Sequence, residues 1–176
     1  RSLTVLLLNM IRVGILTISD RSARGERPDE AGPLIARLLA DQFGWDCSLT
    51  AVVPDELDQI RDALIAWADE GQADLILTTG GTGPAPRDVT PEATRAALER
   101  EAPGIPEALR AASLAITKHA MLSRQVAGIR KRTLIVNMPG NPKAVKENLD
   151  VLIPILPHAL ELIQSDPGAE AGHRSV

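Results

Sequence analysis

The chain has 176 residues and a net charge of −4 at pH 7, with 44% hydrophobic and 24% charged residues. This balance is that of an ordinary globular domain, and the small negative charge argues against a general nucleic-acid binder. One Phe, two Trp and no Tyr leave almost nothing to stack on unpaired bases, which argues against single-strand binding. Cys47 is the only cysteine, so no internal disulfide forms, and we expect an inert core thiol in a reducing, cytoplasmic compartment.

The two ends of the chain differ in character from its middle. Residues 3–8 are apolar but too few to span a membrane, and no small-residue cleavage site follows them. We expect residues 1–9 to be a leader or added residues, with Met10 as the natural start. The sequence predicts a single domain over residues 10–166 and, because residues 167–176 are mostly Gly, Ala and charged, a flexible tail.

Short apolar runs alternate with helical patterns in the first half of the chain. Residues 13–18 form a short, partly β-branched apolar run that predicts a buried strand, and residues 48–53 and 75–79 predict a second and a third strand. Between them, apolar residues recur at helical spacing in two stretches that end at Gly44 and Gly71, where glycine is suited to stop a helix.

Loop and capping residues separate these elements. Residues 22–28 are polar and predict a mobile loop. Asp55 and Thr90 each precede a helical pattern, and a side-chain oxygen there can accept from the free N–H groups of the first turn. Prolines and a glycine at 103–106 end one helix and begin another, which we expect to reach about Lys118.

The last third of the chain predicts a hairpin and a helix. Residues 125–128 and 133–137 indicate paired strands, and their basic tip, residues 129–132, is expected to be solvated and to bind no ligand. Two prolines should kink or break a final helix over residues 143–163. The order of elements predicts an α/β fold: a three-layer α/β/α domain with a mostly parallel central sheet plus a late β-hairpin.

The segment between the third strand and the next helix carries the strongest chemical signal. Residues 80–83 read Gly-Gly-Thr-Gly and can turn N–H groups toward an anion, because glycine tolerates the dihedrals of an amide nest. Arg87 adds positive charge, and Asp88 adds a hard oxygen ligand suited to Mg²⁺. Residues 84–86, Pro-Ala-Pro, exclude both a P-loop and the dinucleotide fingerprint. A glycine-rich turn without a ligand is the alternative.

Four polar loops follow the predicted strands. Ser19 and Asp20 follow the first strand, Asp55 the second, residues 80–88 the third and residues 137–143 the last. In open α/β sheets, ligands bind outside the carboxyl ends of the strands, so we expect these loops to form one site. Phosphoryl chemistry suits such a site, since it needs positioning and charge stabilisation more than a protein nucleophile.

These segments together resemble a known family. The matching stretches are residues 14–21, 53–56, 80–92, 123–125 and 137–143. They closely resemble the molybdopterin adenylyltransferases, the MogA/MoaB-like group that is related to the G domains of gephyrin-type proteins. The resemblance runs from about Val13 to about Ile163, and five motifs in order are far more specific than any single one.

The resemblance implies a reaction in which the terminal phosphate of molybdopterin attacks the α-phosphorus of Mg-ATP and pyrophosphate leaves. It implies that Asp55 and Asp88 are catalytic and hold Mg²⁺, the only cofactor expected. The implied substrate-binding residues are Ser19, Asp20, Thr79, Gly80, Gly81, Thr82, Gly83, Arg87, Ser123, Arg124, Asn137, Pro139, Gly140 and Lys143. It also implies a homotrimer and a molybdenum insertase as partner; we expect no nucleic acid and no membrane.

Other interpretations stay open. A non-catalytic scaffold that binds the pterin phosphate and a nucleotide-pyrophosphate hydrolase would both use the same fold. Single residues also have simpler explanations: Asp55 as a helix cap only, Ser19 and Asp20 as turn residues, Arg87 in a surface ion pair and Lys143 as an exposed lysine. The sequence decides neither the nucleotide preference nor whether the pathway uses molybdenum or tungsten.

Overall fold

Six strands form one sheet in the order β2-β1-β3-β6-β5-β4, in a computed structural model that describes residues 10–165. The strands are β1 (Arg12–Ile18), β2 (Asp46–Val53), β3 (Leu75–Thr79), β4 (Arg100–Glu101), β5 (Ala127–Arg130) and β6 (Thr133–Met138). The helices are α2 (Asp20–Ala23), α3 (Ala31–Phe43), α4 (Leu57–Asp69), α5 (Thr90–Ala97), α6 (Gly104–Leu114), α7 (Pro142–Leu152) and α8 (Leu156–Gln164), with short 3-10 helices η1 (Lys118–Leu122) and η2 (Ile153–Ile155). The expectations for residues 1–9 and 167–176 concern residues outside the described range.

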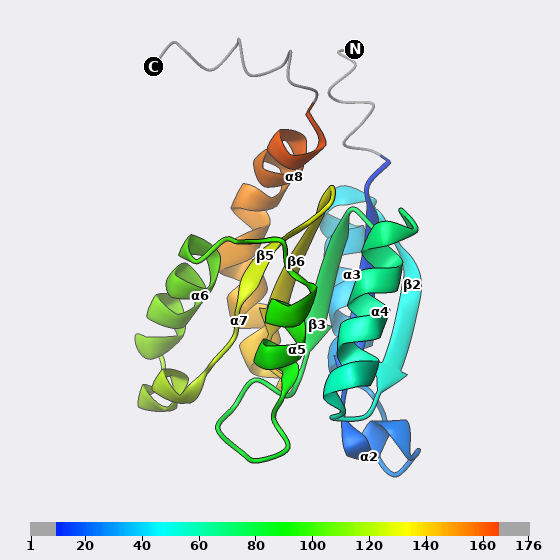
Figure 1. Ribbon diagram of the computed structural model, residues 1–176. Helices are drawn as coiled ribbons and strands as arrows, with labels where there is room; N and C mark the ends of the chain where they lie inside the picture. Colours follow the sequence, from blue (N-terminus) through cyan, green and yellow to red (C-terminus); the bar gives the residue numbers. More distant parts are fainter. Residues whose placement is uncertain (1–9, 166–176) are drawn as a thin grey trace.

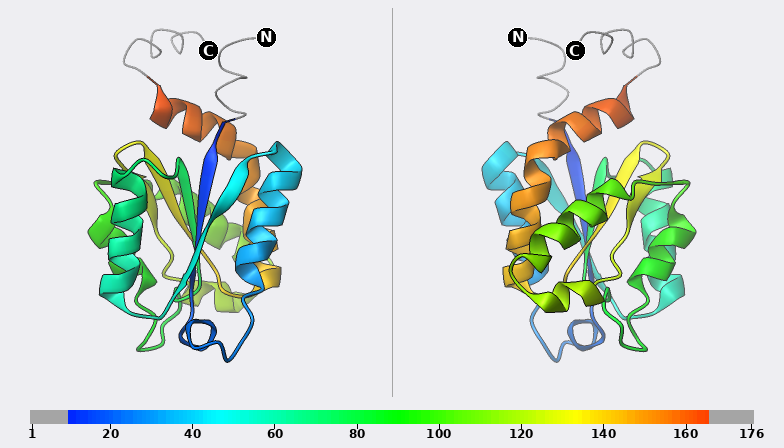
Figure 2. Two further views of the ribbon diagram at one scale, coloured as in Figure 1. Left: turned by 90° about the vertical axis from the view of Figure 1, so that its right-hand side faces the viewer. Right: turned by 90° about the vertical axis from the view of Figure 1, so that its left-hand side faces the viewer.

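The predicted three-layer arrangement is confirmed. Strands β2, β1, β3 and β6 are parallel, and the hairpin β5–β6 and the short strand β4 add antiparallel pairs at one side. Helices α4 and α5 cover one face of the sheet, and α3, α6, α7 and α8 cover the other (Figures 1 and 2). Within residues 10–165, no helix is both long and apolar enough to cross a bilayer.

Strand alternation explains why the sheet has two cores. Successive side chains of a strand point to opposite faces. In β1, Ile15 therefore packs with α3 on one face while Leu16 packs with α4 on the other, and both are almost fully buried. The continuous apolar runs in the sequence reflect this burial on both faces, which is typical of parallel strands.

Several boundaries differ from the sequence prediction. A helical turn, α2, occupies the start of the loop expected at residues 22–28, because the Ser19 hydroxyl accepts from the Ser22 N–H at 3.2 Å and caps it. Strand β4 was not predicted, and α6 ends at Leu114 rather than near Lys118. The broken helix near the C-terminus is confirmed, since η2 separates α7 from α8.

Two predicted helix caps are wrong. The residue before α4 is Glu56, which makes no side-chain cap, and the Asp55 carboxylate turns instead to the Asp20 N–H. Thr90 lies inside α5, and its hydroxyl donates to the Gly80 carbonyl at 2.9 Å. Both side chains bond the loops at the sheet edge, so tertiary contacts override their local capping preference.

The basic hairpin tip agrees with the expectation only in part. Lys131 and Arg132 are exposed, whereas Arg130 is partly buried, because its guanidinium pairs with Asp69 of α4 and donates to the Ala97 carbonyl at 3.0 Å. The turn itself passes through Lys131, whose φ of 52° is in the left-handed region. The tip thus ties the hairpin to the α4–α5 layer.

Asn137 of β6 is a structural residue. Its side chain is fully buried and donates to the Thr78 and Thr94 hydroxyls, both at 2.9 Å, while its side-chain oxygen accepts from the Val126 N–H at 3.1 Å. The implied substrate-binding role of Asn137 is corrected here, because no polar atom of its side chain faces solvent or is left for a ligand.

We expect Asn137→Ala to lower the free energy of unfolding by about 2–5 kcal/mol, because three buried polar groups lose their partner. Urea unfolding followed by circular dichroism measures the change. Lys143→Ala, at an exposed helix position, is the control and should change stability by less than about 0.5 kcal/mol. Equal stability of the two variants would contradict the assignment.

Candidate active site

The carboxyl ends of β1, β2, β3 and β6 meet at one edge of the sheet, the lower edge in Figure 1. The loops that follow these strands lie together there, as the strand order requires. The longest is residues 80–89, which joins β3 to α5 and which we call the glycine loop.

Two glycines are required where this loop leaves the sheet. Gly80 has a φ of 100°, and a Cβ there would collide with the Ile18 carbonyl oxygen of the neighbouring strand. Gly81 has a φ of 67°, and its Cβ would collide with the Thr90 hydroxyl. Any side chain would therefore push the loop away from the sheet edge.

The carbonyl groups of residues 80–83 are all held by donors of the protein. Thr90 donates its hydroxyl to the Gly80 carbonyl at 2.9 Å and its N–H to the Gly81 carbonyl at 3.1 Å. Arg124 donates its N–H to the Thr82 carbonyl at 2.8 Å and its Nε to the Gly83 carbonyl at 2.8 Å. The Arg124 guanidinium also donates to the Asp88 carbonyl at 2.6 Å and pairs with Glu92.

The N–H groups of the same loop are left for a ligand. Among the described residues, no acceptor bonds the main-chain N–H of Gly81, Thr82 or Gly83. Consecutive amides without partners form a site of positive partial charge that favours an anion such as phosphate. Thr90 and Arg124 hold the carbonyl side of this loop, while any contact of Arg124 with a ligand stays a prediction.

Two carboxylates lie against this row of amides. A Cβ added at Gly81 would be 3.1 Å from Asp55 Oδ1, and one added at Gly83 would be 2.8 Å from Asp88 Oδ2. Asp88 Oδ2 also accepts from the Ala85 N–H at 3.1 Å, which closes the turn that carries it. Asp55 and Asp88 are therefore on the same side of the molecule, next to the glycine loop.

Burial raises the pKa of Asp55 above its ordinary value, and the charges of Asp20 and Asp88 act in the same direction. The pKa of Asp20 is instead lowered, first of all by its hydrogen bonds with Arg87. The two neighbouring carboxylates thus differ in environment: Asp20 is neutralised by a partner, and Asp55 is not.

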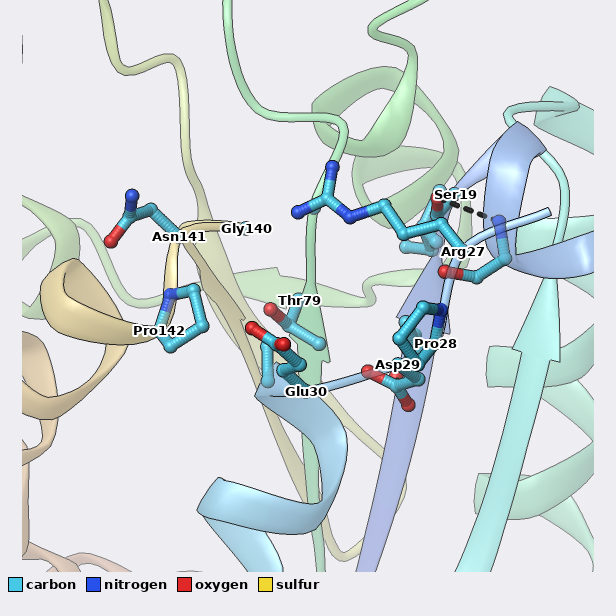
Figure 3. Close-up of a pocket in the computed structure, with 14 residues that line it drawn as sticks. Ser19, Arg27, Pro28, Asp29, Glu30, Thr79, Gly140, Asn141 and Pro142 are labelled. Carbon is cyan, nitrogen blue, oxygen red and sulfur yellow. Dashed lines mark hydrogen bonds between the residues drawn. The ribbon is translucent and has the colours of Figure 1, made fainter.

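A pocket of about 280 Å³ opens beside the loop, between the starts of α3 and α7 (Figure 3). Of the predicted residues, Ser19, Thr79, Gly80 and Gly140 line it. Gly140 approaches closely, since a Cβ there would be 3.3 Å from the Gly80 Cα. The pocket gives a ligand access to the glycine loop from the side of β1 and β6.

Other residues line the pocket although the sequence analysis gave them no role. They are Arg27, Pro28, Asp29 and Glu30, besides Thr17, Ile18, Ser22 and Ala31, whereas Asn141 and Pro142 belong to the stretch 137–143 that was expected at the site. Asp29 is held in place by the Thr17 hydroxyl at 2.7 Å and the Gly32 N–H at 3.0 Å. The sequence did contain a signal for these residues, namely the polar segment that follows the first predicted strand. A loop that starts at the carboxyl end of this strand lies at the same end of the sheet as the other site loops.

Comparison with known proteins agrees with this geometry. A family model described as "Probable molybdopterin binding domain" matches residues 14–158. The chain belongs to this molybdopterin-binding domain family. A molybdopterin adenylyltransferase of Helicobacter pylori strain J99 is 41% identical over 162 residues, which cover 89% of each protein. The solved molybdopterin biosynthesis enzyme MoaB of Thermus thermophilus is 51% identical, with a TM-score of 0.83 over 90% of this chain and 99% of that one.

A longer relative contains a matching segment. Gephyrin of Dictyostelium discoideum is 47% identical over 174 residues, which cover 93% of this chain but only 24% of that protein. The chain thus spans about a quarter of this relative and most of the bacterial one.

In this molybdopterin-binding domain, three further predicted site residues, Pro139, Ser123 and Lys143, do not line the pocket. The Pro139 carbonyl accepts a hydrogen bond from the Thr79 hydroxyl at 2.7 Å, which holds the ends of β6 and β3 together. Ser123 donates its hydroxyl to the Gln125 side chain at 3.0 Å. Lys143 is exposed at the start of α7, and its N–H donates to the side-chain oxygen of the capping residue Asn141 at 2.9 Å. These contacts are structural, and any ligand contact of Pro139, Ser123 and Lys143 stays a prediction.

Cys47 behaves as expected from the sequence. Its thiol is half-buried and free, and burial raises its pKa to about 11. A thiol that stays protonated at neutral pH is a poor nucleophile. Cys47 also lies near the start of β2, at the other end of this strand from Asp55.

We expect Gly80→Ala to destabilise the domain by about 2 kcal/mol or more, because the added Cβ meets backbone at a positive φ. Gly104→Ala is the matched control, since a Cβ there meets nothing within 4 Å and the site begins α6. That variant should be unchanged or more stable by up to about 1 kcal/mol. Thermal unfolding compares them, and a neutral Gly80→Ala would contradict the crowding described.

The raised pKa of Asp55 predicts a stability effect with a definite sign. The folded carboxyl holds its proton more tightly than the unfolded one, whose ordinary value is 3.8, so stability is lost as pH rises from about that value through the folded pKa. We expect Asp55→Asn to have a higher Tm than the parent at pH 7, and the difference to shrink as pH falls toward 4. A lower Tm for Asp55→Asn than for the parent at pH 7 would contradict this prediction. Glu161→Gln is the control for the loss of one negative charge at an exposed position.

Proposed function

We propose that this domain is a molybdopterin adenylyltransferase, which transfers AMP from Mg-ATP to the terminal phosphate of molybdopterin and releases pyrophosphate. The observation that carries the proposal is the row of three unpartnered amides between the Asp55 and Asp88 carboxylates. Relatives that carry this name match most of the chain, which agrees with the assignment.

The reaction needs no nucleophile from the protein. An oxygen of the molybdopterin phosphate forms a bond to the α-phosphorus of ATP, and the bond from that phosphorus to the bridging oxygen breaks as pyrophosphate leaves. Negative charge grows on the phosphoryl oxygens during this exchange, and fixed N–H dipoles stabilise such charge without having to reorganise. The N–H groups of Gly81, Thr82 and Gly83 would fill this role, which is supported by the hydrogen bonds that hold the carbonyls of the same peptide units, those of residues 80–82.

The carboxylates fit a magnesium ion. Proteins usually hold Mg²⁺ through one or two carboxylates together with substrate phosphates, and Asp55 and Asp88 supply two hard oxygen donors beside the amides. Within residues 10–165, no group of three or more His, Cys, Asp or Glu side chains is placed to hold a metal by itself. When bound, the ion would offset charge on the phosphates.

The pocket beside the loop suits an organic part of a substrate. Pro28 and Pro142 supply apolar surface, and Arg27, Asp29 and Glu30 supply polar groups around it. Figure 3 shows Arg27 extending toward the side of the pocket where Asn141 lies. A ligand seated there would place its phosphate against Gly80, at the entrance to the amide row.

Assembly and partners form part of the same proposal. A homotrimer in the cytoplasm, acting with a molybdenum insertase that receives the adenylylated pterin, is what the family resemblance implies. The gephyrin relative, in which a matching segment makes up 24% of a longer chain, fits a product that is handed to a neighbouring domain.

One assay distinguishes the proposal from its alternatives. The protein is incubated with molybdopterin, ATP and Mg²⁺, and pterin-AMP and pyrophosphate are measured. Both products should appear in equal amounts. Tight pterin binding without product would indicate a scaffold, and AMP release from a dinucleotide without pterin would indicate a hydrolase.

We expect Asp88→Asn to reduce kcat at least about a hundredfold, a typical loss when a key electrostatic group is removed. The loop turn should survive, because the asparagine carbonyl can still accept from the Ala85 N–H. Molybdopterin affinity and Tm should therefore stay close to those of the parent, with Glu161→Gln as a control for net charge. A parallel loss of pterin binding would show that Asp88 has another role.

A further inference from the structure

Two loops at the active-site edge exchange a reciprocal pair of hydrogen bonds. The Asp20 N–H donates to Asp55 Oδ2 at 2.9 Å, and the Asp55 N–H donates to Asp20 Oδ1 at 3.0 Å. Asp20 follows β1 and Asp55 follows β2, so this pair joins the ends of two adjacent strands. Each carboxylate is thereby held at one oxygen by the main chain of the other loop.

Arg87 of the glycine loop closes this arrangement from a third side. Its Nε and Nη2 donate to the two oxygens of Asp20 at 2.7 and 3.0 Å, a bidentate geometry that fixes orientation as well as distance. The same Nη2 donates to the Asp55 carbonyl at 3.1 Å and to Glu56 Oε1 at 2.9 Å. We call Asp20, Asp55 and Arg87 the interlock.

The interlock leaves one carboxylate oxygen free. Asp20 Oδ1 accepts from Asp55 and Arg87, and Asp20 Oδ2 accepts from Arg87, so both oxygens of Asp20 are in use. Asp55 Oδ2 is held by Asp20, whereas Asp55 Oδ1 has no donor among the described residues and lies beside Gly81. The bond at Oδ2 therefore determines where Oδ1 points.

We propose that Asp20 and Arg87 are positioning residues, which aim Oδ1 of Asp55 at the amide row, and that neither one contacts the substrate. This replaces the substrate-binding role that the family resemblance implied for both. The inference rests on the proposed function only where it concerns turnover; the orientation of Asp55 is a property of the protein alone.

The exposure of the Arg87 side chain distinguishes a role in positioning Asp55 from a role in stabilising the fold. The Arg87 side chain is 57% exposed, and ion pairs at such sites add little to the free energy of unfolding because water and salt screen them. Losing the Arg87 ion pair alone should therefore leave Tm almost unchanged. Losing the interlock should alter the geometry of Asp55, and small displacements of a catalytic group are enough to cost orders of magnitude in rate.

The test compares Asp20→Ala, which removes both acceptors, with Asp20→Asn, which keeps an acceptor for the Asp55 N–H. Glu56→Gln is the control, since it alters another partner of Arg87 without touching the Asp20–Asp55 pair. Amide hydrogen exchange at residue 55 reports the interlock without any substrate. Turnover and the separately measured affinity for Mg-ATP report its consequence.

We expect Asp20→Ala to speed exchange of the Asp55 amide at least about tenfold and to lower kcat about tenfold to a hundredfold, with Mg-ATP affinity within about threefold of the parent. Asp20→Asn should recover much of the protection and part of kcat, and Glu56→Gln should change neither. Unchanged exchange in Asp20→Ala would overturn the interlock. Unchanged kcat, or a loss confined to Mg-ATP affinity, would overturn the positioning role.

The two proposals fail in different ways. If the parent protein makes no pterin-AMP, the proposed function is wrong, while fast exchange in Asp20→Ala still supports the interlock. If the parent is active and the exchange rate of the Asp55 amide does not respond to Asp20→Ala, the function stands and the interlock is wrong.

Discussion

The site depends on how the four carbonyl groups of residues 80–83 are held. A peptide unit that has its carbonyl bonded to the protein cannot turn freely, so its N–H stays where the loop leaves it. Thr90, at the start of α5, and Arg124, after η1, bond all four carbonyls between them. The amides of residues 81–83 are left without protein partners among the described residues, which is the feature that suits a phosphate ester.

Negative charge is distributed unevenly around these amides. Asp20 is neutralised by Arg87, and Glu92 is paired with Arg124, but Asp55 is partly buried with no cation of the described residues bonded to its side chain. A carboxylate in such a place lowers the stability of the empty protein. The same surroundings favour the binding of a divalent cation. The lower stability of the empty domain and the affinity expected for Mg-ATP therefore have one physical origin, the unpaired carboxylate of Asp55.

The sequence predicted the sheet and its layers because burial on both faces of a strand requires a continuous apolar run. The strand at residues 75–79 is buried on both faces, and its apolar run is visible without any structure. Helix starts were predicted less well. Asp55 and Thr90 have the local chemistry of caps, yet Asp55 bonds a loop 35 residues away and Thr90 bonds the strand end ten residues before it. Local propensity is worth about 1 kcal/mol at a cap, which a single tertiary hydrogen bond can outweigh.

By itself, the sequence determined that a glycine-rich turn follows a buried strand with two acidic residues nearby, because backbone dihedrals and residue types are local properties. It also determined the order of strands and helices that brings four loops to one edge. Only the tertiary structure decided what each side chain does there. Arg124 lies 41 residues from the Gly83 carbonyl that it bonds, and Arg87 lies 67 residues from Asp20. Partners so far apart are brought together by the packing of the sheet, which a local sequence pattern does not contain.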